Sequence, residues 1–232
     1  MTLNAKIRKT IQIFRENFPS ELTALIEQGA GEISALNIVE RALKPGDRAP
    51  DFTLKDYGYR ERRLSDYLKG GPVVVTFYRG AWCPYCNLQL AAYNAHLDEI
   101  RAAGATLVAI TPESPDGIQI FLDSEAPQDA RGMITDAPDF DVLHDVGNMV
   151  AAEFGLTFKL PEAHRKLLAM MKMDIEKANG DDSYIFPDPA TYIIGCDGTI
   201  VWAFVPNNYR KRAEAEDIIN QLNQIKSQGE KI

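Results

Sequence analysis

The amino-acid sequence predicts an α/β fold in which a mixed central β-sheet is flanked by helices. Short runs rich in β-branched and aromatic residues alternate with longer segments in which apolar residues recur every three or four positions. The last two strand-like runs are joined by Asp197-Gly198, a tight-hairpin signal that makes them antiparallel. Helices separate the earlier strand-like runs, as parallel pairing requires, so the sheet should contain both kinds of pairing.

The composition excludes several classes of protein. The 232 residues carry a formal net charge of −8 and no polybasic patch, so the chain lacks the electrostatic footprint of a nucleic-acid binder. The longest apolar stretches, residues 73–75 and 106–110, are far shorter than the roughly 20 residues that cross a bilayer. Secretion is not expected, because the N-terminus has no apolar signal core and the three cysteines are an odd number. We therefore expect a cytoplasmic protein, with a basic N-terminal transit segment as the alternative.

The N-terminal region predicts two helices ahead of the sheet. Apolar residues that share one face predict an amphipathic helix over residues 5–18. Pro19 ends this helix, and Ser20 caps a second one. A loop containing Pro and Gly, residues 43–51, marks the start of a different region. We therefore expect an N-terminal helical extension, residues 1–43, followed by a main domain, residues 44–232.

The first half of the main domain alternates strands and helices. The predicted elements are a buried strand over 72–78, a helix over 84–102, a strand over 105–111, a helix from Ser114-Pro115 through Leu122, a strand over 132–135, and a helix capped by Asp139 that ends at Gly155. The second half should contain an inserted helix near 161–179, an antiparallel strand pair over 191–194 and 199–205, and a final helix over 211–226.

The segment Trp82-Cys83-Pro84-Tyr85-Cys86 carries the chemistry that the sequence predicts. It follows the strand 72–78 after a short link and begins a helix, with Pro84 suited to the first helical position. Both sulfurs should therefore meet unpaired backbone N–H groups and the positive end of the helix dipole, which favours a thiolate. Their spacing places them on one helix face, where a disulfide closes without unwinding the turn. The motif predicts a pair that cycles between dithiol and disulfide.

Two other interpretations of the cysteines are weaker. A zinc site needs two more ligands, and the remaining Cys and His residues form no second paired arrangement. An inert buried pair is disfavoured, because strand-to-helix turns of α/β sheets are where ligand-binding groups gather. Cys196 lies seven residues beyond Pro189, or roughly 23 Å along a strand, so it should sit at the opposite end of the sheet if Pro189 packs beside the active thiols.

Four stretches of the sequence resemble the peroxiredoxin family, in the alkyl hydroperoxide reductase/thiol-specific antioxidant group with the thioredoxin-like fold. They are the N-terminal signature over 46–54, the strand and helix start over 73–86, the strand exit over 109–113, and the closing hairpin over 188–198. In the register of that family, Cys86 falls on the peroxidatic position and Cys83 replaces a threonine. The Cys-Pro-Tyr-Cys tetrad also resembles glutaredoxin, and Trp82 resembles the residue that precedes the thioredoxin motif. Those two families use the first cysteine, here Cys83, so the resemblances leave the attacking sulfur open.

The resemblance also implies supporting residues. Arg79 stands where the family has proline, which puts the peroxide pocket in doubt, and the strand that usually supplies an activating arginine has none. Arg79, Arg210 and Arg212 are the candidates for that role. Pro189 corresponds to the cis-proline that faces the thiols in thioredoxin-fold proteins.

The function that the resemblance implies is a thiol peroxidase for hydrogen peroxide or organic hydroperoxides, recycled by a thioredoxin- or glutaredoxin-type donor. It needs no metal, flavin or haem of its own, and a homodimer is consistent with the family. A general thiol-disulfide oxidoreductase is the main alternative, favoured by the tetrad and by Arg79. A non-catalytic binding protein that kept the fold is the third interpretation.

Overall fold

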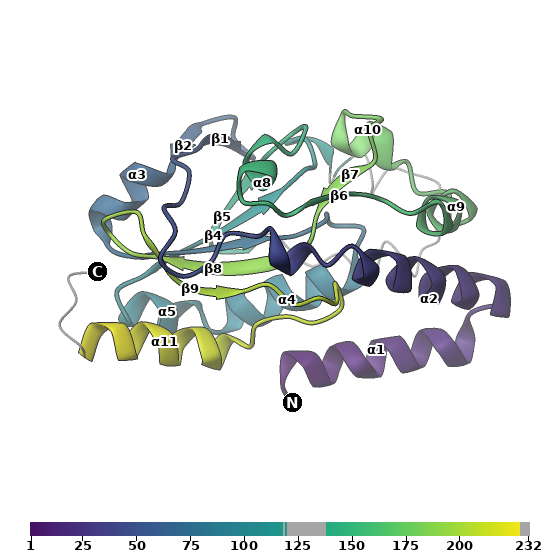
Figure 1. Ribbon diagram of the computed structural model, residues 1–232, viewed down its shortest axis with the longest axis horizontal. Helices are drawn as coiled ribbons and strands as arrows, with labels where there is room; N and C mark the ends of the chain where they lie inside the picture. The colour runs from purple at the N-terminus through teal and green to yellow at the C-terminus, as the bar shows by residue number, and fades with distance from the viewer. Residues whose placement is uncertain (118, 120–137, 228–232) are drawn as a thin grey trace.

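The computed structural model describes residues 1–117, 119 and 138–227, and its centre is a seven-stranded mixed sheet (Figure 1). The strand order is β2-β1-β5-β4-β3-β8-β9. Strands β3 and β4 pair in parallel, as do β4 and β5, whereas the other neighbours are antiparallel. The bounds are β1 Thr53–Asp56, β2 Glu61–Arg63, β3 Val73–Phe77, β4 Thr106–Thr111, β5 Asp141–His144, β8 Ala190–Ile194 and β9 Ile200–Phe204. The predicted mixed α/β fold is confirmed.

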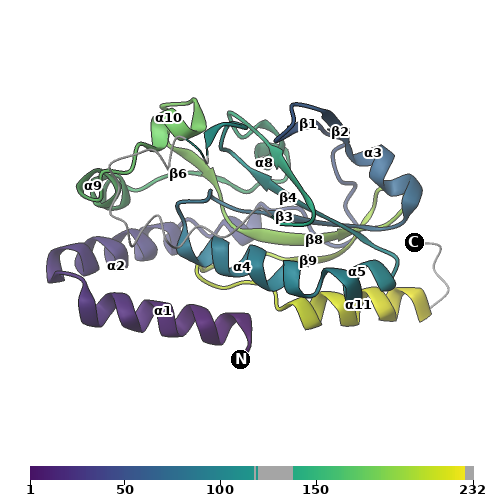
Figure 2. The same cartoon turned by 180° about the vertical axis from the view of Figure 1, so that it is seen from behind.

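Both faces of the central strands are buried, because their side chains alternate between two apolar cores. Val74 of β3 joins the first core, whereas Val73 and Val75 join the second. The first core is covered by α4 Pro84–Ala95, α5 Leu97–Ala102 and α11 Ala215–Ser227, and the second by α3 Leu64–Tyr67 and α8 Met149–Glu153 (Figures 1 and 2). The resulting three-layer arrangement fixes the ends of β3, from which the cysteine motif departs.

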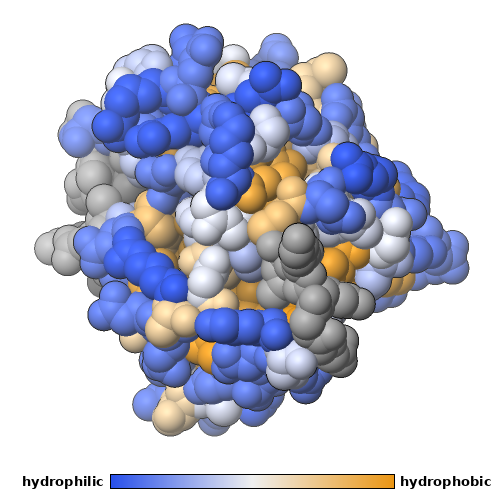
Figure 3. Space-filling view, turned by 90° about the vertical axis from the view of Figure 1, so that its left-hand side faces the viewer, coloured by the Kyte–Doolittle hydropathy of each residue, from blue (hydrophilic) through white to orange (hydrophobic). Residues whose placement is uncertain are grey.

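The N-terminal helices are α1 Leu3–Asn17 and α2 Ser20–Ala35, as the sequence predicts. They lie beside each other, and α2 packs against α9 Glu162–Met170 (Figure 1). A short 3-10 helix, Ile38–Glu40, leads into the main domain, and another, Leu68–Gly70, precedes β3. No helix among the described residues is long and apolar enough to span a membrane. The end of the molecule near α3 has a mostly hydrophilic described surface with small apolar patches (Figure 3).

The single helix predicted from Asp139 to Gly155 is wrong in its first half, and only Met149–Glu153 is helical. Its first part is strand β5, because Val142 and Leu143 are both buried on opposite faces of the sheet and the segment pairs with β4. The left-handed backbone of Asn148, with φ of 60°, separates this strand from α8. The carboxylate of Asp145 then accepts hydrogen bonds from the first backbone N–H groups of that helix.

Two long predicted helices are each divided. Residues 84–102 form α4 and α5 with a break at His96, and residues 161–179 form α9 and α10 Ile175–Asn179. Lys172 has a φ of 53°, which interrupts the second helix. A small antiparallel sheet of β6 Thr157–Lys159 and β7 Ile185–Pro187, which the sequence analysis missed, flanks this insertion. The predicted helix through Leu122, beyond its first residues, and the strand over 132–135 lie outside the described residues.

Candidate active site

The two cysteines lie at the start of α4, immediately after the loop that leaves β3. Cys83 occupies the N-cap position, with Pro84 in the first turn of the helix. The backbone N–H groups of Cys86 and Asn87 both donate to the Cys83 carbonyl oxygen, at 3.0 and 3.1 Å. Both cysteines are free thiols with fully buried side chains. The predicted placement of both sulfurs at a helix N-terminus is confirmed.

Each sulfur has its own arginine. The Nη2 atom of Arg79 lies 3.4 Å from Cys83 Sγ, and the Nη2 atom of Arg212 lies 3.3 Å from Cys86 Sγ. Of the three candidate arginines, Arg210 does not reach the thiols and instead pairs with Glu27 at 3.1 Å. The arginine contacts are therefore supplied by the loop after β3 and by the connection between β9 and α11.

Both arginines are held rigidly. The Nε atom of Arg212 donates to Gln89 Oε1 at 2.6 Å, and its Nη1 atom donates to the carbonyl oxygens of Tyr209 and Lys211. Arg79 lies between two aromatic rings, 4.9 Å from the Trp82 ring centroid and 4.2 Å from that of Tyr209. Cation–π contact in a desolvated site stabilises the guanidinium without a carboxylate that would neutralise it.

The environment makes the two thiols unequal. Burial opposes ionisation of Cys83, but the hydrogen bond from Cys86 and the charges of Arg79 and Arg212 outweigh it and hold the pKa of Cys83 well below its ordinary value. Burial, together with the hydrogen bond to Cys83 and the negative charge there, raises the pKa of Cys86 well above its ordinary value. Ionisation of Cys83 is therefore favoured over ionisation of Cys86, and the charge on either sulfur affects the other.

Two buried carboxyl groups accompany the thiols, and the sequence analysis did not assign either a role. Both oxygens of Glu113 lie 3.0 Å from the backbone nitrogen of Ala81, and burial raises the pKa of Glu113 to about 7. Burial likewise raises the pKa of Asp188 to about 7, although the charges of Arg212, Arg79 and Arg41 oppose the shift. Glu113 belongs to one of the stretches that carry the family resemblance, but no local pattern indicates that it folds over Ala81.

Pro189 lies at the predicted end of the sheet, but the prediction of a cis bond before it is wrong. Ala190 pairs with Phe77 in the register of β8 with β3, so Pro189 is near the end of β3 from which the cysteine loop departs. The peptide bonds of the described residues are all trans. The physical reason is continuity: only Asp188 and Pro189 separate β7 from β8, and a trans bond lets the chain run extended from one into the other.

Cys196 lies at the opposite end of the sheet, as predicted. It belongs to the hairpin turn between β8 and β9, beyond Ile194, which pairs with Val73 at the far end of β3. Gly198 has a φ of 85°, the left-handed backbone that this turn requires. Among the described residues, no group of three or more His, Cys, Asp or Glu side chains is arranged to hold a metal ion.

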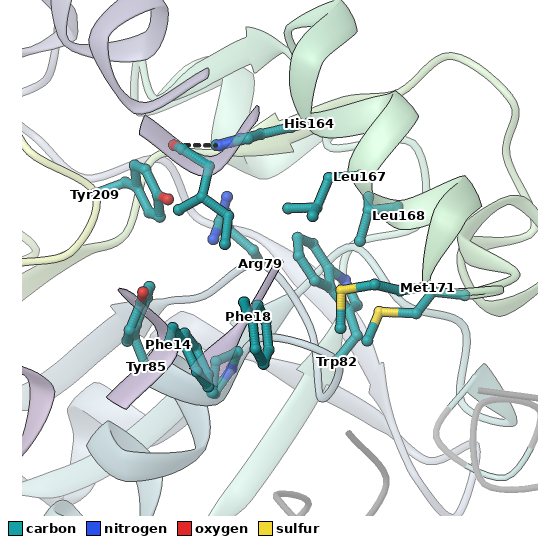
Figure 4. A pocket seen from close by; sticks show the side chains of 13 residues that line it. Phe14, Phe18, Arg79, Trp82, Tyr85, His164, Leu167, Leu168, Met171 and Tyr209 are labelled. Atoms are coloured by element: carbon teal, nitrogen blue, oxygen red, sulfur yellow. Dashed lines mark hydrogen bonds between the residues drawn. The ribbon is translucent and has the colours of Figure 1, made fainter. Parts of the chain in front are cut away.

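A cavity of about 70 Å³ adjoins the cysteine motif (Figure 4). The predicted supporting residues Trp82, Pro84, Tyr85 and Arg79 all line it. Its other walls come from α1, α2, α9 and Tyr209, which the sequence analysis did not connect with the site. Small molecules therefore have a space beside the arginine that contacts Cys83.

Comparisons with known proteins identify the family. The model of the AhpC/TSA family matches residues 45–203, which is more than half of the chain. The chain therefore belongs to the AhpC/TSA family, and the predicted resemblance is confirmed.

Among its relatives, Rv2521 of Mycobacterium tuberculosis is 36% identical over 104 residues, which cover 44% of this chain and 62% of that protein. Peroxiredoxin Bcp of Escherichia coli is 30% identical over 114 residues, which cover 49% of this chain and 65% of that protein. Both matches span less than two thirds of the relative. The crystal structure of peroxidoxin BcpB from Mycobacterium tuberculosis aligns with a TM-score of 0.55 at 24% identity, covering 79% of this chain and 98% of that chain, and supports the fold.

Proposed function

We propose that this protein is a thiol peroxidase that reduces hydrogen peroxide or organic hydroperoxides through the Cys83–Cys86 pair. The observation that carries the proposal is the pair of buried sulfurs one helical turn apart, each with its own arginine at 3.4 or 3.3 Å. Buried cations stabilise both the attacking thiolate and the negative charge that develops on the departing oxygen.

The reaction has three balanced steps. A thiolate attacks one peroxide oxygen, the O–O bond breaks, and the sulfur is oxidised to a sulfenic acid while the other oxygen leaves and is protonated to water or an alcohol. The second thiol attacks the sulfenic sulfur, releases water and forms the Cys83–Cys86 disulfide. An external dithiol then reduces this disulfide by thiol–disulfide exchange and is itself oxidised.

We assign the attack to Cys83. Its lowered pKa and its contact with Arg79, which also lines the cavity, support this assignment, whereas the family register favours Cys86. The complete burial of both sulfurs, together with the small size of the cavity, favours a small peroxide over a protein disulfide as the oxidising substrate.

The experiment is peroxide consumption by the reduced protein, compared with the Cys83→Ser/Cys86→Ser double variant. Turnover above the double variant supports a peroxidase, whereas rapid reduction of insulin disulfides without peroxide turnover would instead establish the general oxidoreductase. Trapping of sulfenic acid with dimedone in the two single variants identifies the nucleophile. We expect the adduct on Cys83 of Cys86→Ser, and an adduct only on Cys86 of Cys83→Ser would reverse the assignment.

Three further features belong to the proposal. A thioredoxin- or glutaredoxin-type protein is the expected reductant, because the disulfide needs a dithiol donor. We propose a cytoplasmic location, because the reducing conditions of the cytosol would keep such a pair cycling. A homodimer rests on family analogy, and the division into an extension, residues 1–43, and a main domain, residues 44–232, rests on the sequence and on the matched region.

A further inference from the structure

Tyr209 contacts the arginine of each sulfur, and it uses a different group for each. Its ring centroid lies 4.2 Å from Arg79 Cζ, whereas its backbone carbonyl oxygen accepts a hydrogen bond from Arg212 Nη1. These are the two guanidinium groups that contact Cys83 Sγ and Cys86 Sγ. A single residue of the segment between β9 and α11 therefore takes part in holding both positive charges at the thiols.

The two arginines are not held in the same way. Arg212 is fixed by hydrogen bonds, since its Nε atom donates to Gln89 Oε1 and its Nη1 atom donates to two carbonyl oxygens. Arg79 Nε has no hydrogen-bond partner among the described residues, and the guanidinium lies between the rings of Trp82 and Tyr209 (Figure 4). Tyr209 is the closer ring, and a separate part of the chain supplies it. The position of Arg79 therefore depends on the Tyr209 ring.

Tyr209 is itself fixed in place. Its side chain is buried, and its ring meets the ring of His164 edge to face with the centroids 5.6 Å apart. The ring of Tyr85, in the first turn of α4, lies 6.2 Å away, and Arg210 Nε donates to the Tyr209 hydroxyl at 3.4 Å. The family model ends its match at residue 203. The ring that supports Arg79 therefore comes from outside the matched region.

Movement of Arg79 would act on Cys83 more than on Cys86. Burial opposes the ionisation of Cys83, and the hydrogen bond from Cys86 together with the charges of Arg79 and Arg212 outweighs it. The interaction between two charges falls with their separation and is strong in a desolvated site. A guanidinium that moves away from Cys83 Sγ therefore withdraws stabilisation from that thiolate first, while Arg212 continues to face Cys86.

We propose that Tyr209 is a positioning residue whose ring holds Arg79 against Cys83 and thereby selects Cys83, and not Cys86, as the thiolate. The inference rests on the proposed function, because it names the residue that determines the nucleophile of that site. A side-chain substitution keeps the backbone carbonyl oxygen that holds Arg212, so it removes the ring contact alone. The two contacts of Tyr209 can therefore be separated by experiment.

The test is a thiolate titration, followed by absorbance at 240 nm, in a Cys86→Ser/Cys196→Ser protein in which Cys83 is the single cysteine. Tyr209→Leu should raise the pKa of Cys83 by about 1, a tenfold change in its acid dissociation constant, because the energy of a desolvated cation–π contact is of that size. Tyr209→Phe keeps the ring and should titrate as the parent protein does.

The reciprocal protein, Cys83→Ser/Cys196→Ser, is the matched control. Tyr209→Leu should move the pKa of Cys86 much less than that of Cys83, because Arg212 keeps its hydrogen bonds. A merely structural role of the tyrosine would instead disturb both sulfurs alike.

A double-mutant cycle shows whether Tyr209 acts through Arg79. Once Arg79 is replaced by Met, Tyr209→Leu should raise the pKa of Cys83 no further. A ring-fluorinated phenylalanine at position 209 keeps the shape of the ring but weakens the negative charge on its face, so it tests the same contact even if Tyr209→Leu does not fold. We expect this variant to titrate at a higher pH than Tyr209→Phe.

Three results would overturn the inference: equal titrations of Cys83 in Tyr209→Phe and in the leucine or fluorinated variant, equal shifts of Cys83 and Cys86, or a shift that persists in the Arg79→Met background. None of these titrations uses peroxide. A protein that gives the expected titrations but consumes no peroxide would therefore overturn the proposed function and keep the role of Tyr209.

Discussion

The buried carboxyl group of Glu113 makes the stability of the protein depend on pH in a direction opposite to that of an ordinary ion-paired carboxylate. The unfolded chain loses this proton near pH 4.5, whereas burial raises the pKa in the folded protein to about 7. Between these values the folded state binds more protons, so the free energy of unfolding falls as the pH rises. The difference between the two pKa values corresponds to about 3 kcal/mol, all of it lost once the pH exceeds the folded value.

The groups that face Glu113 either raise its pKa further or carry no charge. The thiolate of Cys83 raises its pKa, the backbone N–H of Ala81 and the hydroxyl of Thr111 lower it, and the pKa of the nearby Tyr57 is raised to about 12, so its phenol stays neutral. His144 Nδ1 donates to the backbone carbonyl oxygen of Glu113, and burial lowers the pKa of this imidazole. Glu113→Gln keeps an oxygen for the Ala81 N–H and removes only the titration.

The assay is urea denaturation of the reduced protein and of Glu113→Gln between pH 4 and 8. We expect the stability of the variant relative to wild type to increase by about 3 kcal/mol across this range, because only wild type must ionise a buried acid. Asp188 contributes a similar slope to both proteins and cancels in the comparison. Glu61→Gln, on the exposed edge strand β2, is the control for the loss of one carboxyl group. Parallel pH profiles for wild type and Glu113→Gln would refute the reasoning.

Two further predictions concern the arginine contacts and the packing of α2 against α9. Arg79→Met should raise the pKa of Cys83, the thiol that this guanidinium contacts, and the measurement is an upward shift of the thiolate absorbance titration at 240 nm. Arg210→Met is the control, because Arg210 contacts neither sulfur and its loss should not shift the titration. Equal titrations in both variants would contradict the assignment. Gly29→Ala should destabilise the protein by about 1–3 kcal/mol in urea denaturation, because its Cβ would lie 2.3 Å from His164 Cδ2. Gly31→Ala, on the same helix with no atom within 4 Å of its Cβ, should instead stabilise by about 0.5–1 kcal/mol. Similar losses of stability in both variants would contradict the steric explanation for Gly29.

The sequence predicted the position of the cysteines because their placement depends on local chemistry. A proline at the first helical position after a buried strand is enough to put Cys83 at the N-cap and Cys86 in the first turn. Arg79 and Arg212 were identified as candidates together with Arg210, but nothing local distinguishes them. The distinction depends on how the segment before α11 folds back over α4, which is a tertiary property.

The wrong and missing predictions have the same origin, because they too depend on tertiary contacts. The apolar spacing of residues 139–150 fits a helix, and only pairing with β4 makes residues 141–144 a strand. The walls of the cavity come from α1 and α2 and from α9, which follows them by more than a hundred residues of sequence. The packing of α2 against α9 depends on the close approach of Gly29 and His164. Periodicity predicts that these helices have apolar faces, but it does not indicate which helix each face contacts.

The four buried ionisable groups around the thiols, two arginines and two acids, are best understood together. Two arginines face two sulfurs, and two acids with pKa values raised to about 7 lie within electrostatic reach. If Asp188 were ionised, the arginine charges would be shared between its carboxylate and the sulfurs, and an ionised Glu113 would place a second negative charge near Cys83, so the thiolate would lose part of its stabilisation. Below pH 7 burial keeps the acids neutral, so the arginines act on the sulfurs alone. The same burial that makes the carboxyl groups unfavourable for stability at high pH therefore reserves the positive charge for the thiolate below pH 7.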